Sequence, residues 1–271
     1  MSFMNIKRVL KSVLNMEMVN YLKSIKIKYF PSAYEIKFFQ SQKELLERRS
    51  NFYSNYIKRG ELCFDVGANI GNRVDAFLNI GARVIAIEPQ EDCVSVLEKK
   101  YGKKIQIVNK GVGAKEEFLD FYTSQTSVLS SFSTDWIKSV EISNRFSNSN
   151  WNKVQKIEIT TLDKLINKFG LPVFIKIDVE GYENEVLMGL SHQIKTLSFE
   201  YTVPEQTVKA ISCIEKLENI DREFDCNYCT GESMEMILNH WLSPTDMKEL
   251  ISDQKFTSSG FGDIYIRFKN I

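Results

Sequence analysis

The chain has 271 residues, 43% of them hydrophobic, which is enough for one large domain or for one domain with an extension. Its 35 basic and 35 acidic residues cancel, which argues against a broad electrostatic surface for nucleic acid. No apolar run reaches about 18 residues, so we expect no membrane-spanning helix and no secretory signal. Five cysteines favour a reducing, cytoplasmic location over a disulfide framework.

The first part of the chain differs from the rest, and we predict a basic, helical extension over residues 1–52 ahead of a larger domain over residues 53–271. Residues 1–30 contain six basic side chains and one acidic side chain, and their apolar residues recur at helical spacing. Such a helix could contact a membrane surface peripherally or bind a partner protein. Alternatively, it packs on the domain with its basic face in solvent.

From about residue 53, strand-like and helix-like segments alternate, which predicts a parallel sheet covered by helices on both faces. The predicted strands are 62–66, 84–88, 105–110, 172–179 and 196–201, and the predicted helices are 73–80, 93–101 and 183–190. Residues 263–268 alternate between apolar and polar side chains, which indicates a last, antiparallel strand.

Residues 117–160 interrupt this alternation. Predicted strands at 118–122 and 156–160 flank a stretch rich in serine and asparagine, with Phe132, Trp136 and Trp151 interspersed. An insertion of this length in a domain is usually functional or disordered, so we interpret it as a lid or acceptor-binding segment. The alternative is a helical excursion whose aromatic side chains pack onto the domain.

A glycine-punctuated turn follows the first strand, with the sequence DVGANIG over residues 65–71. Glycines let the backbone approach a ligand closely, and a helix N-terminus offers unpaired N–H groups. Glu88 ends the second strand, 88 − 65 = 23 residues after Asp65. That spacing is close to the one at which an acid meets a ribose in nucleotide-binding βαβ units.

Acidic residues end several predicted strands, namely Asp65, Glu88, Asp178, Glu180 and Glu200. Such a cluster would repel a pyrophosphate but attract a cationic ligand with ribose hydroxyls, a description that S-adenosylmethionine fits. Lys176 lies inside the fourth strand, where an unpaired charge is costly, so we expect Asp65 and Glu200 to be its partners. A purely structural ion network of Lys176, Asp178 and Glu200 is the alternative.

Five blocks in order, DVGANIG (65–71), IEP (87–89), TLD (161–163), IKIDVEGYE (175–183) and GDIY (262–265), resemble the FkbM family of S-adenosylmethionine-dependent methyltransferases. The resemblance covers roughly residues 53–268 and is weak over 203–255. It implies a Rossmann-like class I methyltransferase fold, α/β, with a seven-stranded mostly parallel sheet, helices on both faces and an antiparallel last strand. It also implies methyl transfer to oxygen, often on sugars or natural products.

The resemblance assigns parts of the cofactor to individual positions. The methionine end would lie against Asp65, Gly67, Ala68, Asn69 and Gly71, the ribose hydroxyls against Glu88, and the adenine against Pro89, Gln90, Lys110, Gly111 and Val112. Asp178 would face the methyl group, and Ser130 and Ser131 stand where the family often has a serine pair.

The catalytic base is not settled by the resemblance. Our hypothesis is Asp178 as base or acceptor orienter, with Glu180 second, while His192 or His240 could take the proton if the fold brings one close. We predict no metal, although the oxygens of Asp178 and Glu180 would suit Mg²⁺.

Other interpretations of the chain stay open. Cys213, Cys226, Cys229 and His240 could form a zinc site, but the spacing is not standard and buried free thiols are the simpler interpretation. An NAD-dependent oxidoreductase is disfavoured because Asn69 replaces the middle glycine of Gly-x-Gly-x-x-Gly. A non-catalytic cofactor-binding scaffold is a further alternative. The expected partner is a small-molecule or glycan acceptor rather than nucleic acid.

Overall fold

The computed structural model describes residues 33–145 and 149–271, so the predicted amphipathic helix within residues 1–30 lies outside the described residues. The chain divides into two compact units, Met1–Arg48 and Arg49–Ile271, and α3 (Ala33–Tyr53) runs across the division. All other helices and strands of the described residues belong to the second unit. Among the described residues, no helix is both long enough and apolar enough to span a bilayer.

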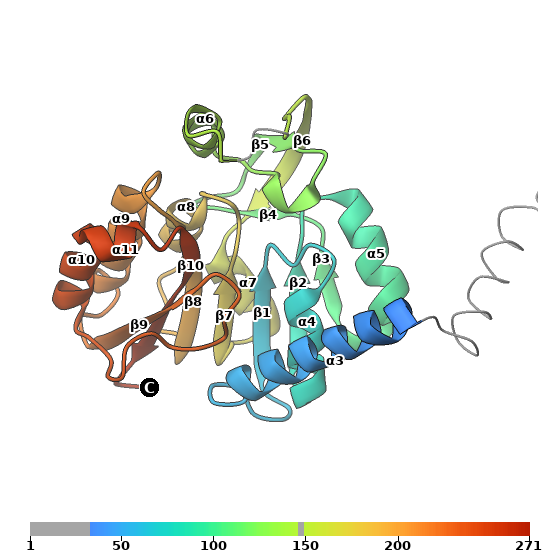
Figure 1. Cartoon of the computed structure of the whole chain (residues 1–271), viewed down its shortest axis with the longest axis horizontal. Helices are drawn as coiled ribbons and strands as arrows, with labels where there is room; N and C mark the ends of the chain where they lie inside the picture. The colour runs from blue at the N-terminus through green and yellow to red at the C-terminus, as the bar shows by residue number, and fades with distance from the viewer. Residues whose placement is uncertain (1–32, 146–148) are drawn as a thin grey trace, which may run out of the picture. The chain divides into compact units, whose positions relative to one another are not determined.

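A seven-stranded sheet forms the centre of the second unit (Figure 1). Its strands are β1 (Leu62–Val66), β2 (Arg83–Ile87), β3 (Gln106–Val108), β7 (Phe174–Ile177), β8 (Thr196–Thr202), β9 (Phe224–Thr230) and β10 (Phe261–Phe268). They lie in the order β3-β2-β1-β7-β8-β10-β9. β10 is antiparallel to both of its neighbours, and the first five strands of that order are parallel. The predicted sheet, with its antiparallel last strand, is confirmed.

Both faces of the sheet are covered because its strands are apolar on both sides. On one face, Phe64, Ile175 and Phe199 belong to a large core shared with α7–α10. On the other face, Phe77 of α4 packs edge-on against Phe174. The helices around the sheet are α4 (Asn72–Ile80), α5 (Glu91–Tyr101), α7 (Leu162–Phe169), α8 (Glu183–Met188), α9 (Thr207–Glu218), α10 (Pro244–Ser252) and α11 (Gln254–Thr257), with a 3₁₀ turn η1 at Gly102–Lys104.

Two predicted strands are shorter than expected at their functional ends. The predicted strand 105–110 ends at Val108, after which the chain enters a second sheet as β4 (Gly111–Val112). The predicted strand 172–179 ends at Ile177, so Asp178 lies in the following turn rather than in the strand. β9 and α9–α11 were not predicted, although the buried side chains of α9, at 210, 213, 214 and 217, recur at helical spacing.

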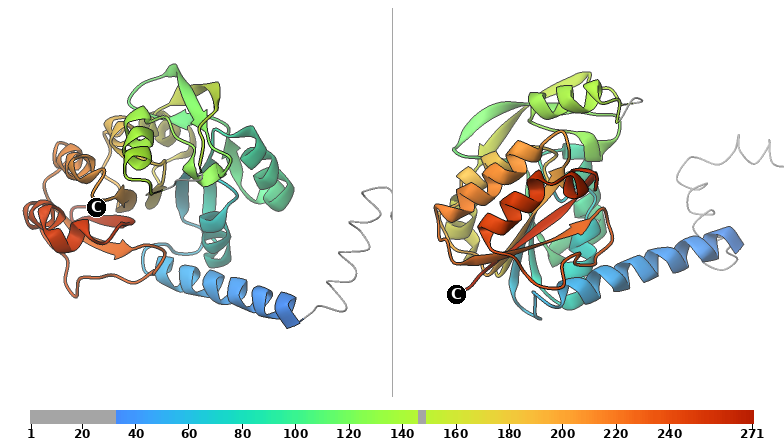
Figure 2. Two further views of the ribbon diagram at one scale, coloured as in Figure 1. Left: turned by 45° about the horizontal axis from the view of Figure 1, so that its top comes forward. Right: turned by 60° about the vertical axis from the view of Figure 1, so that its left-hand side comes forward.

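The insertion over residues 117–160 forms a small structure of its own (Figure 2). It consists of β5 (Glu117–Thr123), the 3₁₀ turn η2 (Ser127–Leu129), α6 (Thr134–Ile142) and β6 (Lys153–Thr160). β4, β6 and β5 make a three-stranded sheet. Leu129, Trp136, Ile137 and Val140 form a small core, against which Trp151 packs. Trp136 and Trp151 therefore pack inward, as the alternative interpretation expected.

Candidate active site

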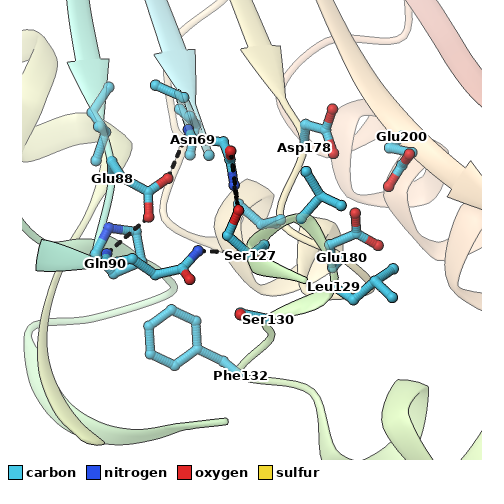
Figure 3. Close-up of a pocket in the computed structure, with 18 of the residues that line it drawn as sticks. Asn69, Glu88, Gln90, Ser127, Leu129, Ser130, Phe132, Asp178, Glu180 and Glu200 are labelled. Atoms are coloured by element: carbon cyan, nitrogen blue, oxygen red, sulfur yellow. Dashed lines mark hydrogen bonds between the residues drawn. The ribbon is translucent and has the colours of Figure 1, made fainter. Parts of the chain in front are cut away.

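A cavity of about 510 Å³ opens at the carboxyl ends of the parallel strands and is lined in part by the insertion (Figure 3). This size falls within the range of small-molecule sites, about 300–1,000 Å³. Of the residues assigned to the cofactor, and of the two predicted catalytic acids, all except Gly71 line the cavity, namely Asp65, Gly67, Ala68, Asn69, Glu88, Pro89, Gln90, Lys110, Gly111, Val112, Asp178 and Glu180. Open α/β sheets bind ligands at this edge, as the sequence pattern predicted.

The glycine turn after β1 forms the floor of the cavity. The N–H groups of Gly67 and Ala68 donate to the carbonyl of Ile87, which ties the turn to the end of β2. Gly67 has a φ of 83°, and a Cβ there would overlap the carbonyl oxygen of Asp178. Only glycine therefore allows the turns after β1 and β7 to touch.

Glu88 is the centre of the next part of the cavity wall. It is 2% exposed, and its two carboxylate oxygens accept the N–H groups of Asn69 and Gln90, each at 2.8 Å. Burial raises the pKa of Glu88 to about 7, against the opposing effect of these two hydrogen bonds. A carboxylate has about four lone-pair positions, so it can still accept ribose hydroxyls. Its position and chemistry fit the predicted ribose site.

The 3₁₀ turn η2 reaches over this region from the insertion. The side chain of Asn69 donates to the hydroxyl of Ser127 (3.2 Å), and the amide of Gln90 donates to the carbonyl of Ser127 (3.1 Å). Figure 3 shows these contacts as dashed lines. The insertion therefore contributes to the predicted cofactor site as well as to the opposite side of the cavity.

Asp65 provides a buried negative charge at the end of β1. It is 1% exposed, and among the described residues its Oδ2 atom has no hydrogen-bond partner. Burial raises its pKa to about 7, while the charges of Arg73 and Lys176 lower it. An unsatisfied carboxylate oxygen in the wall of a cavity suits a cationic group such as an ammonium. The cavity therefore fits a ligand with both an ammonium and a ribose.

Lys176 is paired, as expected, but not with the predicted partners. Its ammonium lies 2.6 Å from Asp263 and 3.3 Å from Asp178, and the structure places no ion pair between Lys176 and Asp65 or Glu200. Burial lowers the pKa of Lys176, but the charges of Asp178 and Asp263 more than offset this and raise it. Asp263 belongs to β10, which is separated from the strand of Lys176 by β8, and the two side chains meet across β8. The prediction considered only strands next to β7, so it missed Asp263.

Asp178, Glu180 and Glu200 form an acidic cluster, with one oxygen of each lying within 4.8 Å of the others (Figure 3). Burial and the charge of Asp178 raise the pKa values of Glu180 and Glu200. The three carboxylates have the oxygen chemistry of a divalent-metal site. They can equally accept hydroxyl protons or hydrogen bonds. The ammonium of Lys176 already supplies one positive charge beside Asp178.

The remaining wall contains residues that the sequence analysis did not assign to a site, namely Asn72, Arg145, Thr202, Glu232, Phe261 and Arg73. Arg73 donates to Glu232 at 2.8 Å, and Arg49 lies 3.3 Å from the same carboxylate. Burial would raise the pKa of Glu232, but the two arginines lower it to about 2. Arg73 lies two residues after the glycine turn, so its position alone could have marked it as a site residue. Glu232 lies in a segment without a motif, so nothing in the sequence marked it.

Several predicted residues lie elsewhere. Gly71 caps the start of α4 in a left-handed conformation, and its carbonyl accepts the hydroxyl of Tyr101 at 2.7 Å, so it shapes the turn without lining the cavity. His192 lies 3.0 Å from Asp163, and His240 is exposed; neither lines the cavity.

The cysteines do not form the zinc site considered as an alternative. All five are free and buried, and among the described residues no group containing a cysteine is arranged to hold a metal. Ser130 lines the cavity, whereas Ser131 donates to the backbone of Glu180.

Comparison with known proteins agrees with this geometry. A sequence-family model described as the methyltransferase FkbM domain matches residues 65–238. A comparison with curated proteins found no match.

Several solved structures have a distantly related fold. A precorrin-6y C5,15-methyltransferase from Geobacter metallireducens shares 9% identity over 85% of this chain and 87% of its own, with a TM-score of 0.42. A SAM-dependent methyltransferase from Archaeoglobus fulgidus shares 15% over 92% of this chain and all of its own, with a TM-score of 0.40. Fibrillarin from Aeropyrum pernix, with natively bound S-adenosyl-L-methionine, shares 9% over 78% of this chain and 68% of its own, with a TM-score of 0.42. Similarities this distant do not bear on the substrate of this chain.

The matched region begins at Asp65 and includes the glycine turn, Glu88, the insertion and the Asp178–Glu180 turn, which are the parts that build the cavity. The strand order, with an antiparallel β10 between β8 and β9, is the class I arrangement that the resemblance implied. The chain therefore belongs to the FkbM family of methyltransferases, and S-adenosylmethionine is its cofactor.

Proposed function

We propose that this methyltransferase acts on a hydroxyl oxygen of a sugar, a glycan or a hydroxylated natural product, with Asp178 and Glu180 serving the acceptor. The acidic cluster carries the proposal, because its three carboxylates gather in the same cavity as Asp65 and Glu88. Carboxylates accept hydrogen bonds from hydroxyl groups, so the cluster suits an acceptor rich in hydroxyls.

The lining of the cavity offers one group of residues for the cofactor and another for the acceptor. Asp65, Gly67, Asn69 and Glu88 lie at the carboxyl ends of β1 and β2, and they would hold the methionine and ribose parts of the cofactor. The second group lies at the end of β8, at the start of β10 or in the insertion, namely Glu200, Thr202, Phe261, Trp136 and Arg145. Phe261 is 45% exposed, so its ring is available to a sugar or another ring in the acceptor.

The cofactor supplies an electrophilic methyl group on a sulfonium sulfur when it is bound. A hydroxyl is a weak nucleophile and must lose its proton as it attacks, so a nearby base lowers the barrier. Asp178 is held at the end of β7 by its N–H bond to Val66 and by the ammonium of Lys176. Glu180 has a raised pKa, which makes its ionised form the stronger base. Orientation of the acceptor by these carboxylates adds to the effect.

The test begins with calorimetric titration of S-adenosylmethionine and S-adenosylhomocysteine, followed by a screen of sugars and hydroxylated natural products for methylation. With an acceptor in hand, we expect Asp178→Asn to lower kcat by about 10²–10⁴-fold while cofactor affinity stays near that of the natural protein. Glu180→Gln is the parallel variant. Full turnover in both variants, or methylation of nitrogen or carbon in place of oxygen, would overturn the proposal.

The acidic cluster makes metal dependence a separate question. Turnover that survives a strong chelator would assign the cluster to the acceptor alone. Loss of turnover that Mg²⁺ restores would assign Asp178, Glu180 and Glu200 to a metal instead.

A further inference from the structure

The turn that carries Glu180 has an unusual backbone. Glu180 has a φ of 54° and Gly181 a φ of 83°, both in the left-handed region. Glutamate rarely adopts this conformation, and it persists only where the surroundings impose it. Part of the restraint is local, because Oε1 of Glu183 accepts the N–H groups of Val179 and Gly181, each at 3.1 Å.

The rest of the restraint comes from two other elements. The hydroxyl of Ser131, in the insertion, donates to the carbonyl of Glu180 at 2.6 Å. The ammonium of Lys209, in α9, donates to the carbonyl of Gly181 at 3.0 Å and to the hydroxyl of Ser133 at 3.0 Å. One lysine therefore binds both the turn and the insertion.

The insertion also contacts the turn through its core. Trp136 is fully buried, and a Cβ added to Gly181 would lie 2.5 Å from its Cγ atom, so the indole packs directly on Gly181. Ser133 caps α6 by accepting the N–H of Trp136, so Lys209 lies beside the N-terminus of that helix. A cation is unfavourable at a helix N-terminus, so the hydrogen bonds to Gly181 and Ser133 must compensate for its position.

We propose that Lys209 and Ser131 are positioning residues that hold Glu180 toward the cavity, and that they do so only while the insertion is seated on the turn. The inference rests on the proposed role of Glu180. It adds that the acceptor side of the site is assembled by the insertion rather than by the sheet alone. Two side chains that do not themselves line the cavity then determine whether the acid is in place.

The first experiment is hydrogen exchange, measured by mass spectrometry on the full-length protein in three forms: natural, Lys209→Met and Lys216→Met. Lys216 is the matched control, because it lies on the same helix and, within the described residues, its ammonium makes no hydrogen bond or ion pair. We expect Lys209→Met to speed exchange roughly tenfold in peptides covering both 178–183 and 131–142, because two charge-assisted hydrogen bonds are lost. The control should leave both peptides, and β1, unchanged.

The second experiment follows the Glu180 carboxyl directly, by NMR of protein with ¹³C-labelled glutamate, with the resonance assigned through Glu180→Gln. The charged groups facing Glu180 are Asp178, Glu183, Glu200 and Lys176. In Ser131→Ala, which changes no charge, the turn relaxes toward water, so the midpoint of the Glu180 titration should move down toward that of an ordinary glutamate. Lys209→Met also removes a cation, which alone would raise the midpoint, so we expect a smaller fall in that variant. In Lys216→Met the midpoint should not move.

The proposal fails if Lys209→Met speeds exchange in only one of the two peptides, or in neither, because the coupling would then be absent. It also fails if the Glu180 titration is the same in all forms. Neither measurement needs an acceptor, so a failure here is distinct from a failure to find oxygen methylation.

Discussion

The two sides of the cavity are built in different ways. The predicted cofactor side is built mainly from the short segments 65–69, 88–90 and 111–112, and the backbone N–H groups of Asn69 and Gln90 donate to one buried carboxylate, Glu88. The acceptor side draws side chains from the insertion, from the ends of β8 and β10 and from the loop that holds Glu232. The position of a backbone N–H donor is set by the fold, whereas each side chain on the acceptor side can be changed by a single substitution. The acceptor side is therefore the part that can differ among proteins sharing this cofactor.

The largest expected effect tests the contact between the two turns. Gly67 and Gly60 have nearly the same φ, 83° and 85°, but a methyl group at Gly67 would strike the carbonyl of Asp178, while nothing lies within 4 Å at Gly60. We expect Gly60→Ala to lower the free energy of unfolding by about 1–2 kcal/mol. Gly67→Ala should lower it by more than about 3 kcal/mol and abolish cofactor binding. Urea unfolding and calorimetry measure both, and equal losses would contradict the contact.

Next in size is the effect of Glu88 on the cofactor. Glu88→Gln removes a charged acceptor, so we expect affinity for S-adenosylmethionine to fall about tenfold to a hundredfold. Because the pKa of Glu88 is about 7, lowering the pH from 8 to 6 protonates most of the carboxyl and should weaken binding to the natural protein by up to about tenfold through Glu88 alone. The variant should keep only the pH dependence due to Asp65. A pH dependence unchanged by the substitution would count against Glu88 as the ribose acid.

Burial of the ionised Asp65 carboxylate should lower the free energy of unfolding at neutral and higher pH. Its pKa is about 7 in the folded protein against an ordinary value of 3.8, so the folded state binds the proton more tightly. The stability gained from this tighter binding is fully present below about pH 4 and is lost as the pH rises through 7. From pH 5 to pH 8, the unfolding free energy of Asp65→Asn should therefore rise by about 2–3 kcal/mol relative to that of the natural protein. Parallel urea-unfolding profiles for the two proteins would refute the burial argument.

The smallest effect belongs to the acceptor side. Phe261 is 45% exposed and makes a wall of the cavity away from the glycine turn. We expect Phe261→Ala to change the unfolding free energy by less than about 1 kcal/mol and to leave cofactor affinity within about twofold of the natural value. Its effect should instead appear as a raised KM for the acceptor. A clear loss of cofactor affinity would mean that the two sides are not separable.

The sequence predicted the side of the site that depends on local chain geometry. β1 begins and ends where its apolar run does, and the glycine turn and Glu88 lie where strand spacing puts them. Side chains brought together by crossovers were missed. Asp263 meets Lys176 only because β10 inserts between β8 and β9, and Glu232 meets Arg73 across 159 residues of chain. No local pattern encodes such pairs, because the two partners are far apart in the sequence and meet only through the order of the strands.

Two strands of the insertion, β5 and β6, pair with each other, and the insertion has a small core of its own around Trp136. It joins the rest of the domain through the pairing of β6 with β4 and through side chains such as Ser127, Ser131 and Ser133. Because Ser127 of the insertion also bonds Asn69 and Gln90, replacing this segment, over evolution or in the laboratory, would change the acceptor side and the predicted cofactor site together, while the central sheet stays intact.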